Sequence, residues 1–156
     1  MFDLDTVDFL CGRFAGTDSI EASVWAEAEV APAQASATRE LGGNVIVQRL
    51  AEERAASRFE VLHVFMADPQ SDDLLLYAFD TFGYPADPPA RGVWHGGELV
   101  LERATERGMS RTRFAPTQAG FRLAKEFRPD PAADWVPVVS GTLDRADGTA
   151  QPGVDQ

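Results

Sequence analysis

The side chain best placed to do chemistry is His63, one of two histidines in the chain. Residues 59 to 66 alternate in a strand-like pattern, which puts His63 on one face with Phe59, Val61 and Phe65. If that face lines a barrel, the imidazole could hydrogen-bond a ligand or serve as an acid or base. The alternative is a core histidine that a neighbour satisfies, or one at a strand position open to water.

Three cations also fall in phase with apolar residues. Turned inward, each would be a buried cation that must find an anion, either a protein carboxylate or the carboxylate of a ligand. The alternative places each charge at a strand end, where it reaches water while its stem packs. The three are Arg49, in phase with Val45 and Val47, then Arg103, in phase with Leu99 and Leu101, and Lys125, in phase with Phe121, Leu123 and Phe127.

Aromatic residues would form core or cavity wall. Tyr84 lies in a proline-rich loop, where it could gate a barrel mouth or cover an interface. Combining the polar and aromatic candidates, we expect the ligand to contact Arg49, His63, Tyr77, Phe79, Trp94 and Arg103.

Motifs of known chemistry are missing from the sequence. It has no Gly-x-Ser-x-Gly, no phosphate-cradling loop and no dinucleotide fingerprint. The two histidines lie on separate elements, and no cluster offers the four ligands of a structural zinc site. A haem would need His63 or His95 as its axial ligand, and His95 falls in a turn. We therefore expect no catalytic residue, no metal and no cofactor.

Short strands joined by turns must position these residues. Residues 3 to 11 predict one helical turn capped by Asp5 or Thr6, which Gly12 ends. Residues 21 to 36, rich in alanine and acids, predict a loose or partly helical connection. Regular turn signals predict an all-β fold, an antiparallel up-and-down β-barrel of about nine or ten strands. After a first strand from Arg13, the expected strands include 45–50, 59–66, 74–82, 91–94, 98–103, 109–114, 121–128 and 135–143.

The opening Phe9-Leu10-Cys11-Gly12-Arg13-Phe14-Ala15-Gly16 resembles the F-L-x-G-x-W-x-G start of lipocalin-like (calycin-type) barrels. More narrowly, it resembles a bacterial lipocalin-like family of unknown function. Phe14 stands where a tryptophan is usual, and His95 stands where such hairpins often have an acid. The resemblance implies a lipocalin-like fold and no particular activity. Further matching segments are 41–43, 47–48, 68–69, 92–99 and 141–145.

Size and charge bound the function. The chain of 156 residues fits one domain, expected over 1–145 with a disordered tail at 146–156. Its formal net charge of -11 disfavours nucleic acid and anionic membranes as partners. Acids at the N-terminus do not suit a signal peptide, so we expect a cytoplasmic protein.

The sequence thus predicts a barrel that binds a small apolar or amphipathic ligand in its cavity. One alternative is a packed scaffold that forms a homodimer. The other is an enzyme that uses His63 as acid or base, with Asp80 of a neighbouring strand orienting it.

Overall fold

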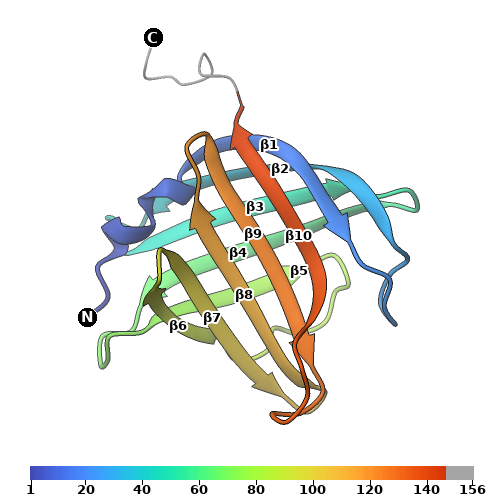
Figure 1. The fold of residues 1–156 in the computed structure, drawn as a ribbon. Coiled ribbons are helices and arrows are strands. Elements are labelled where there is room, and N and C mark those ends of the chain that lie inside the picture. Colours follow the sequence, from blue (N-terminus) through green and yellow to red (C-terminus); the bar gives the residue numbers. More distant parts are fainter. Residues whose placement is uncertain (147–156) are drawn as a thin grey trace.

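The computed structural model describes residues 1–146, which form a closed antiparallel barrel with a short 3-10 helix before it (Figure 1). The tail expected at 146–156 lies outside the described residues except for Ala146. The elements are η1 (Leu4–Leu10), β1 (Gly12–Ile20), β2 (Glu29–Glu40), β3 (Val45–Glu53), β4 (Arg58–Ala67), β5 (Leu74–Asp80), β6 (Ala90–His95), β7 (Glu98–Thr105), β8 (Gly108–Pro116), β9 (Gly120–Arg128) and β10 (Val136–Arg145).

Each strand pairs with the strands before and after it in the sequence, and β1 pairs with β10. This order confirms the expected all-β, up-and-down barrel, with ten strands. Closure removes the free sheet edges that an open meander would expose. Within residues 1–146, no helix has the length and apolar character needed to cross a membrane.

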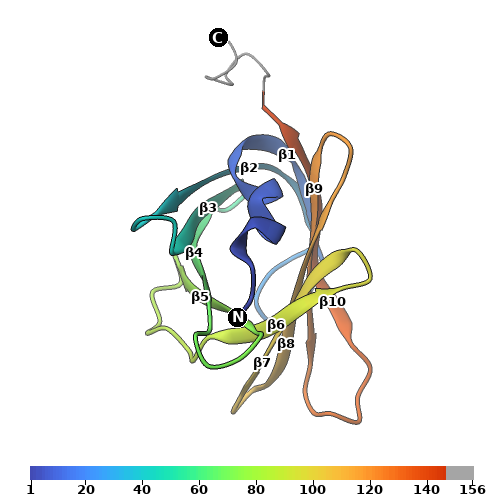
Figure 2. The same ribbon diagram turned by 90° about the vertical axis from the view of Figure 1, so that its left-hand side faces the viewer.

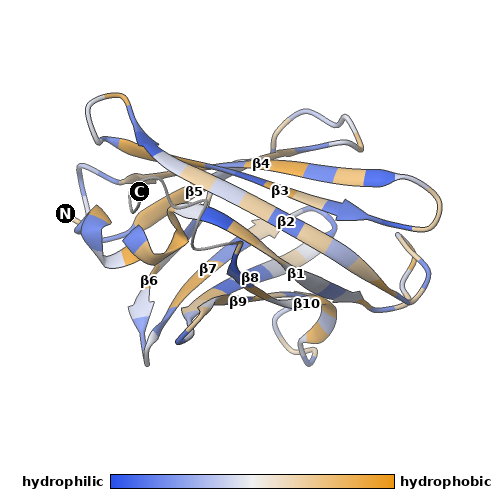
Figure 3. Ribbon diagram, turned by 90° about the horizontal axis from the view of Figure 1, so that it is seen from above, coloured by the Kyte–Doolittle hydropathy of each residue, from blue (hydrophilic) through white to orange (hydrophobic). Residues whose placement is uncertain are grey.

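Alternation along the strands separates an inner from an outer face, visible as bands of colour in Figure 3. The inner face of one half of the barrel is filled by large apolar side chains. Phe14 and Phe121 meet edge to face with ring centroids 4.9 Å apart, and Phe65 and Phe114 pack 5.7 Å apart. These four rings are almost inaccessible to solvent, so this half of the barrel is a packed core.

Helix η1 covers the end of the barrel that this core fills, as Figure 2 shows. Leu4, Val7 and Leu10 are buried against the core, so η1 closes one end of the barrel. The expected cap at Asp5 or Thr6 is wrong, because the Asp3 carboxylate accepts a hydrogen bond from the backbone N–H of Asp5. The helical turn therefore begins earlier than expected.

The expectation of a loose or partly helical connection over 21–36 is wrong for the second half of that segment. Residues 29 to 40 form β2, the longest strand of the barrel. Its alternate alanines, which have low β propensity, are buried on the inner face. Tertiary packing explains why these alanines form a strand, because small side chains fit where β2 passes close to the packed core. These alanines are Ala31, Ala33, Ala35 and Ala37.

Gly16 lies at the seam where β1 meets β10. It is opposite Leu143, and a Cβ at this position would overlap the backbone carbonyl oxygen of Thr142 and lie 2.9 Å from the Cα of Leu143. Only glycine allows the two backbones to approach this closely. Beside it, the Arg145 guanidinium lies over the Phe14 ring at 4.8 Å and donates to the Cys11 carbonyl.

Gly16→Ala should destabilise the barrel, because its Cβ meets the backbone of β10 rather than a movable side chain. We expect a loss of about 1–3 kcal/mol in the free energy of unfolding, measured by urea denaturation. Ala15→Ser on the exposed outer face is the matched control and should change stability by less than about 0.5 kcal/mol. Equal effects of the two substitutions would contradict the role assigned to Gly16.

Candidate functional site

Polar side chains collect on the inner face in the half of the barrel opposite η1. The strand ends that meet there are the C-terminal ends of β1, β3, β5, β7 and β9. Their inward positions differ from the apolar core, because charged and amide groups replace leucine and phenylalanine. The inward polar residues of this half are Asp18, Gln48, Glu52, His63, Arg103 and Lys125, with Asp80 at the rim.

His63 lies at the boundary between the polar half and the core. Its Nδ1 is 2.8 Å from the Gln48 Oε1, and both side chains are buried. Burial, with help from the nearby cations Lys125 and Arg103, holds the pKa of His63 well below its usual range. The ring is therefore neutral, Nδ1–H donates to Gln48, and Nε2 remains an acceptor.

Asp18 and Glu52 form a carboxyl pair between β1 and β3. Burial and a hydrogen bond to Glu52 raise the pKa of Asp18 to about 8, so Asp18 holds a proton at neutral pH. Burial alone would raise the pKa of Glu52, but hydrogen bonds from Asp18 and Arg54 lower it. Arg54 Nη2 lies 2.7 Å from Glu52 Oε1. Gly141 makes room for this pair, since a Cβ there would overlap Asp18 Oδ1.

Lys125 and Arg103 are the cations that face the interior. Burial lowers the pKa of Lys125, and the acidic groups of Glu52, Asp18 and Asp80 offset this only in part. Lys125 is surrounded by other groups of the barrel yet keeps partly accessible surface, so solvent can reach it. Arg103 Nη2 is 3.7 Å from Asp87 Oδ2, while its buried Nε has no hydrogen-bond partner among residues 1–146.

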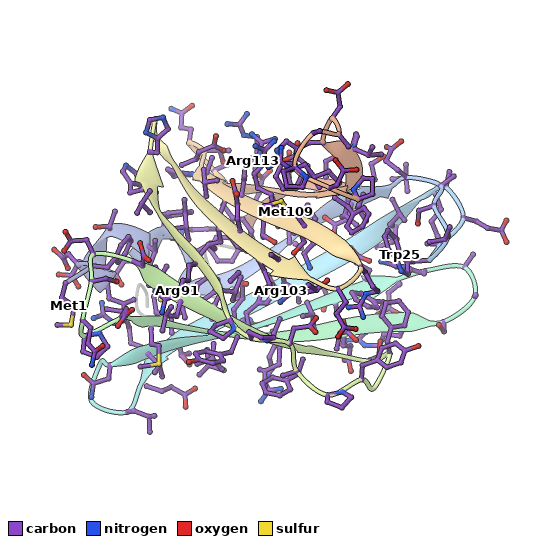
Figure 4. All side chains as sticks on the ribbon, turned by 90° about the horizontal axis from the view of Figure 1, so that it is seen from below. Met1, Trp25, Arg91, Arg103, Met109 and Arg113 are labelled. Atoms are coloured by element: carbon purple, nitrogen blue, oxygen red, sulfur yellow. The ribbon has the colours of Figure 1, made fainter. Side chains whose placement is uncertain are left out.

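Aromatic side chains surround the mouth of this polar half. Trp25, from the connection between β1 and β2, packs edge to face on Phe127 with centroids 5.1 Å apart. Across the barrel, Phe82 contacts Phe59, and the Arg54 guanidinium lies over the Phe59 ring at 4.4 Å. In Figure 4, Arg103 lies inside the barrel, and Trp25 lies at the end away from Met1. The mouth of the barrel is therefore lined by aromatic residues, and the charged residues lie deeper inside.

The predicted ligand residues do not form one site. His63 and Arg103 face the polar interior as expected, with Arg103 paired to Ser110 of β8. Trp94 lies at the opposite, closed end, where it packs on Phe9 of η1 at 5.8 Å and remains 36% exposed. The other three predicted residues are on the outer face.

Arg49 was expected to lie in phase with inward residues, and this is wrong. The inward residues of β3 are Ile46, Gln48, Leu50 and Glu52, so Arg49 points into solvent. Tyr77 and Phe79 of β5 alternate out of the barrel in the same way, and Phe79 is 48% exposed. Apolar residues in phase with a cation therefore did not mark the inner face, because both faces of β3 carry valine or isoleucine.

The sequence interpretation missed Asp18, Gln48 and Glu52 as members of the site. A signal was present in the sequence, because Asp18 is in phase with Phe14 and Gly16 along the first strand. Gln48 and Glu52 likewise alternate with the exposed Arg49. The expected pairing of His63 with Asp80 is wrong, since His63 bonds Gln48 while Asp80 is exposed and bonds the Phe82 N–H.

The polar half of the interior has hydrogen-bonding groups that could bind a polar group. Its imidazole, His63, is neutral and has no carboxylate partner among residues 1–146. The unused hydrogen-bonding atoms of this half are Arg103 Nε, Gln48 Nε2 and Asp18 Oδ1, all buried without a partner among residues 1–146. In the same part of the chain, no group of three or more His, Cys, Asp or Glu side chains is arranged to hold a metal ion.

Asp18→Asn should remove a pH dependence of stability. Between about pH 4, the usual pKa of an aspartate, and about pH 8, the folded protein keeps a proton that the unfolded chain has released, so wild-type stability falls as pH rises. The asparagine can still donate to Glu52 and carries no proton to lose. We expect the variant to be more stable than wild type at about pH 8, by at least about 1 kcal/mol, in urea unfolding.

The difference in unfolding free energy between Asp18→Asn and wild type should shrink as pH falls toward about 5. At lower pH, keeping Asp18 protonated in the folded wild-type protein destabilises it less. Asp144→Asn, at an exposed position, is the control and should leave the pH profile unchanged. A parallel shift of the whole Asp18→Asn curve would show that Asp18 is ionised in the fold.

Comparison with known proteins gives a fold and no family. No family model matches the chain, and no curated protein matches it. Among solved structures, the barrel is similar to the crystal structure of Rv2717c from M. tuberculosis, with a TM-score of 0.70. The match covers 92% of this chain and 97% of that chain at 10% sequence identity. At this identity the likeness shows the barrel fold that the two chains share.

Proposed function

We propose that the barrel binds a small amphipathic ligand in the polar half of its interior, head group first. The observation that carries the proposal is the pair of inward cations with unused hydrogen-bonding capacity, Lys125 and the buried Arg103 Nε. Buried donors without a partner are costly in a folded protein. A ligand that accepts hydrogen bonds from them would recover this cost.

The charges around Lys125 favour an anionic head group. Asp18 holds its proton and Glu52 is paired with Arg54, so neither supplies a free negative charge beside Lys125. Asp80 reaches solvent at the rim. An anion between Lys125 and Arg103 would favour the protonated ammonium, which burial by itself disfavours.

The packed half of the barrel limits the size of the ligand. Phe65 and Phe114 lie edge-on to His63 with centroids 5.8 and 6.1 Å away, and they form the floor of the polar half. The apolar part of the ligand would therefore lie toward the mouth, against Trp25, Phe127 and Phe59. This geometry suits a compact amphipathic acid rather than a long chain.

Lys125→Met should weaken binding of anilinonaphthalene sulfonate, an amphipathic anion whose fluorescence rises in apolar surroundings. Loss of one charge-assisted contact of about 1.5–3 kcal/mol corresponds to roughly ten- to a hundredfold weaker binding. Fluorescence titration measures the affinity. Arg122→Gln, which removes a cation from the exposed outer face, is the control and should leave the affinity unchanged.

Native mass spectrometry before and after denaturation gives a second test with the unmodified chain. A retained small molecule, or saturable binding of one probe per chain that Lys125→Met weakens, supports the proposal. An empty chain that binds no probe, or binding that Arg122→Gln weakens equally, rejects it. The same spectra report the number of subunits, and a dimer without bound molecules would favour the scaffold alternative.

A further inference from the structure

We propose that the outer face of the barrel carries a second site, where Arg13 and Arg49 bind the phosphate or carboxylate of an aromatic small molecule. The two arginines border a hollow of about 590 Å³ on the outside of β1 to β5. The hollow is separated from the polar interior by the wall of the barrel. It therefore takes a different ligand position from the one proposed above.

The register of four strand pairs brings the elements of this site into one row. Arg13 of β1 is opposite Ser36 of β2, and Ser36 is opposite Arg49 of β3. The row continues from Arg49 to Leu62 of β4 and from Leu62 to Phe79 of β5. Residues opposite each other in antiparallel strands share a face, so all five side chains point outward.

The spacing of this row suits one oxyanion. Arg13 and Arg49 are two strands apart, about 10 Å between their Cα atoms, and the short Ser36 side chain lies between them. Two long guanidinium groups can reach toward each other over a serine, and its hydroxyl adds a third donor. Guanidinium pairs of this kind bind phosphate and carboxylate through charge-assisted hydrogen bonds.

The charge of these arginines is not used inside the described part of the chain. Most arginines in residues 1–146 form ion pairs with carboxylates, but Arg13 and Arg49 form none there. Two carboxylates also line the hollow, and neither forms an ion pair with these arginines. Glu60 is held by Arg58, and Asp80 accepts a hydrogen bond from the Phe82 N–H. In a protein of net charge -11, two adjacent cations without a partner are a local positive patch.

The aromatic part of the ligand is inferred from the other end of the row. Leu62 and Phe79 extend the site away from the arginines, and Phe79 is 48% exposed. The small residues Ala15 and Ala51 line the hollow beside this row. A flat apolar ring can therefore lie against this surface while its oxyanion reaches Arg49.

The test is NMR titration of the full chain with three probes: naphthyl phosphate, naphthoate and inorganic phosphate. We expect saturable shifts confined to the outer row, at Ser36, Arg49 and Phe79, with the interior His63 unaffected. Stronger binding of naphthyl phosphate than of naphthoate identifies a phosphate ligand, and the reverse order identifies a carboxylate. Both aromatic probes should bind more tightly than inorganic phosphate.

Arg49→Gln should weaken the aromatic probes by about tenfold or more, since it removes a charge-assisted contact. Phe79→Ala should weaken the naphthyl probes and leave inorganic phosphate unchanged. The matched control is Arg122→Gln, in a second outer hollow of about 600 Å³ whose other arginine, Arg113, is paired with Glu126 and Glu98.

The proposal is overturned if no probe gives saturable shifts at the outer row, or if Arg122→Gln weakens binding as much as Arg49→Gln. Lys125→Met separates this site from the interior one, because it should leave the outer-row shifts unchanged. Failure of interior binding therefore does not affect the outcome here, and failure here does not affect the interior proposal.

Discussion

Closure of the sheet between β1 and β10 is the constraint on which the rest of the structure depends. The first and last strands pair over seven positions, from Phe14 opposite Arg145 to Ile20 opposite Val139. The seam requires close backbone approach, which Gly16 permits on one strand and Gly141 permits beside Asp18 on the other. Without closure, the inner face would open to water and its charged residues would have no defined neighbours.

Once closed, the barrel divides into two halves of different chemistry. Helix η1 and a cluster of phenylalanine rings fill one half, and a large apolar burial there supplies the stability of the fold. The other half contains Asp18, Glu52 and Lys125, whose burial opposes folding unless the groups are neutral or paired. A shared proton and the Arg54 ion pair stabilise the two carboxyls, although Asp18 Oδ1 has no hydrogen-bond partner among residues 1–146. Lys125 has no ion-pair partner in the same part of the chain.

The packed half thus stabilises the fold and tolerates a polar half whose groups are incompletely satisfied. Groups of this kind are common where a protein binds something, since stability is given up locally for recognition. The neutral His63, bonded to Gln48, lies at the junction of the two halves. No carboxylate of residues 1–146 forms a hydrogen bond with its ring, so none orients the imidazole.

The outer face has a different basis for recognition. There the arginines remain hydrated, and only their alignment across β1, β2 and β3 distinguishes them from isolated surface charges. Two of the residues that the sequence suggested as ligand contacts, Arg49 and Phe79, belong to this outer row. The sequence predicted that both residues line the interior, whereas both lie on the outer face of the barrel.

Local patterns in the sequence were enough to predict the fold class and most strand positions. Period-two alternation, glycine and proline turns and the apolar start are properties of neighbouring residues, so they are visible without the fold. The start of strand β2 was not predicted, because the alternate alanines from Ala31 to Ala37 have low β propensity. They adopt a strand because they face the packed core. Which side of each strand faces inward was decided by tertiary structure.

Which residues belong to the candidate site depends on which face of each strand points into the barrel. Arg103 faces inward as expected because only one face of β7 is strongly apolar, and His63 shares its face with the aromatic residues Phe59 and Phe65. Arg49 lies on a strand with apolar residues on both faces. Partners were beyond the sequence: Asp18 meets Glu52, and His63 meets Gln48, only because the strands that carry them lie side by side or across the closed barrel. Residue type and alternation are local, but pairing and burial are set by which strands closure brings together.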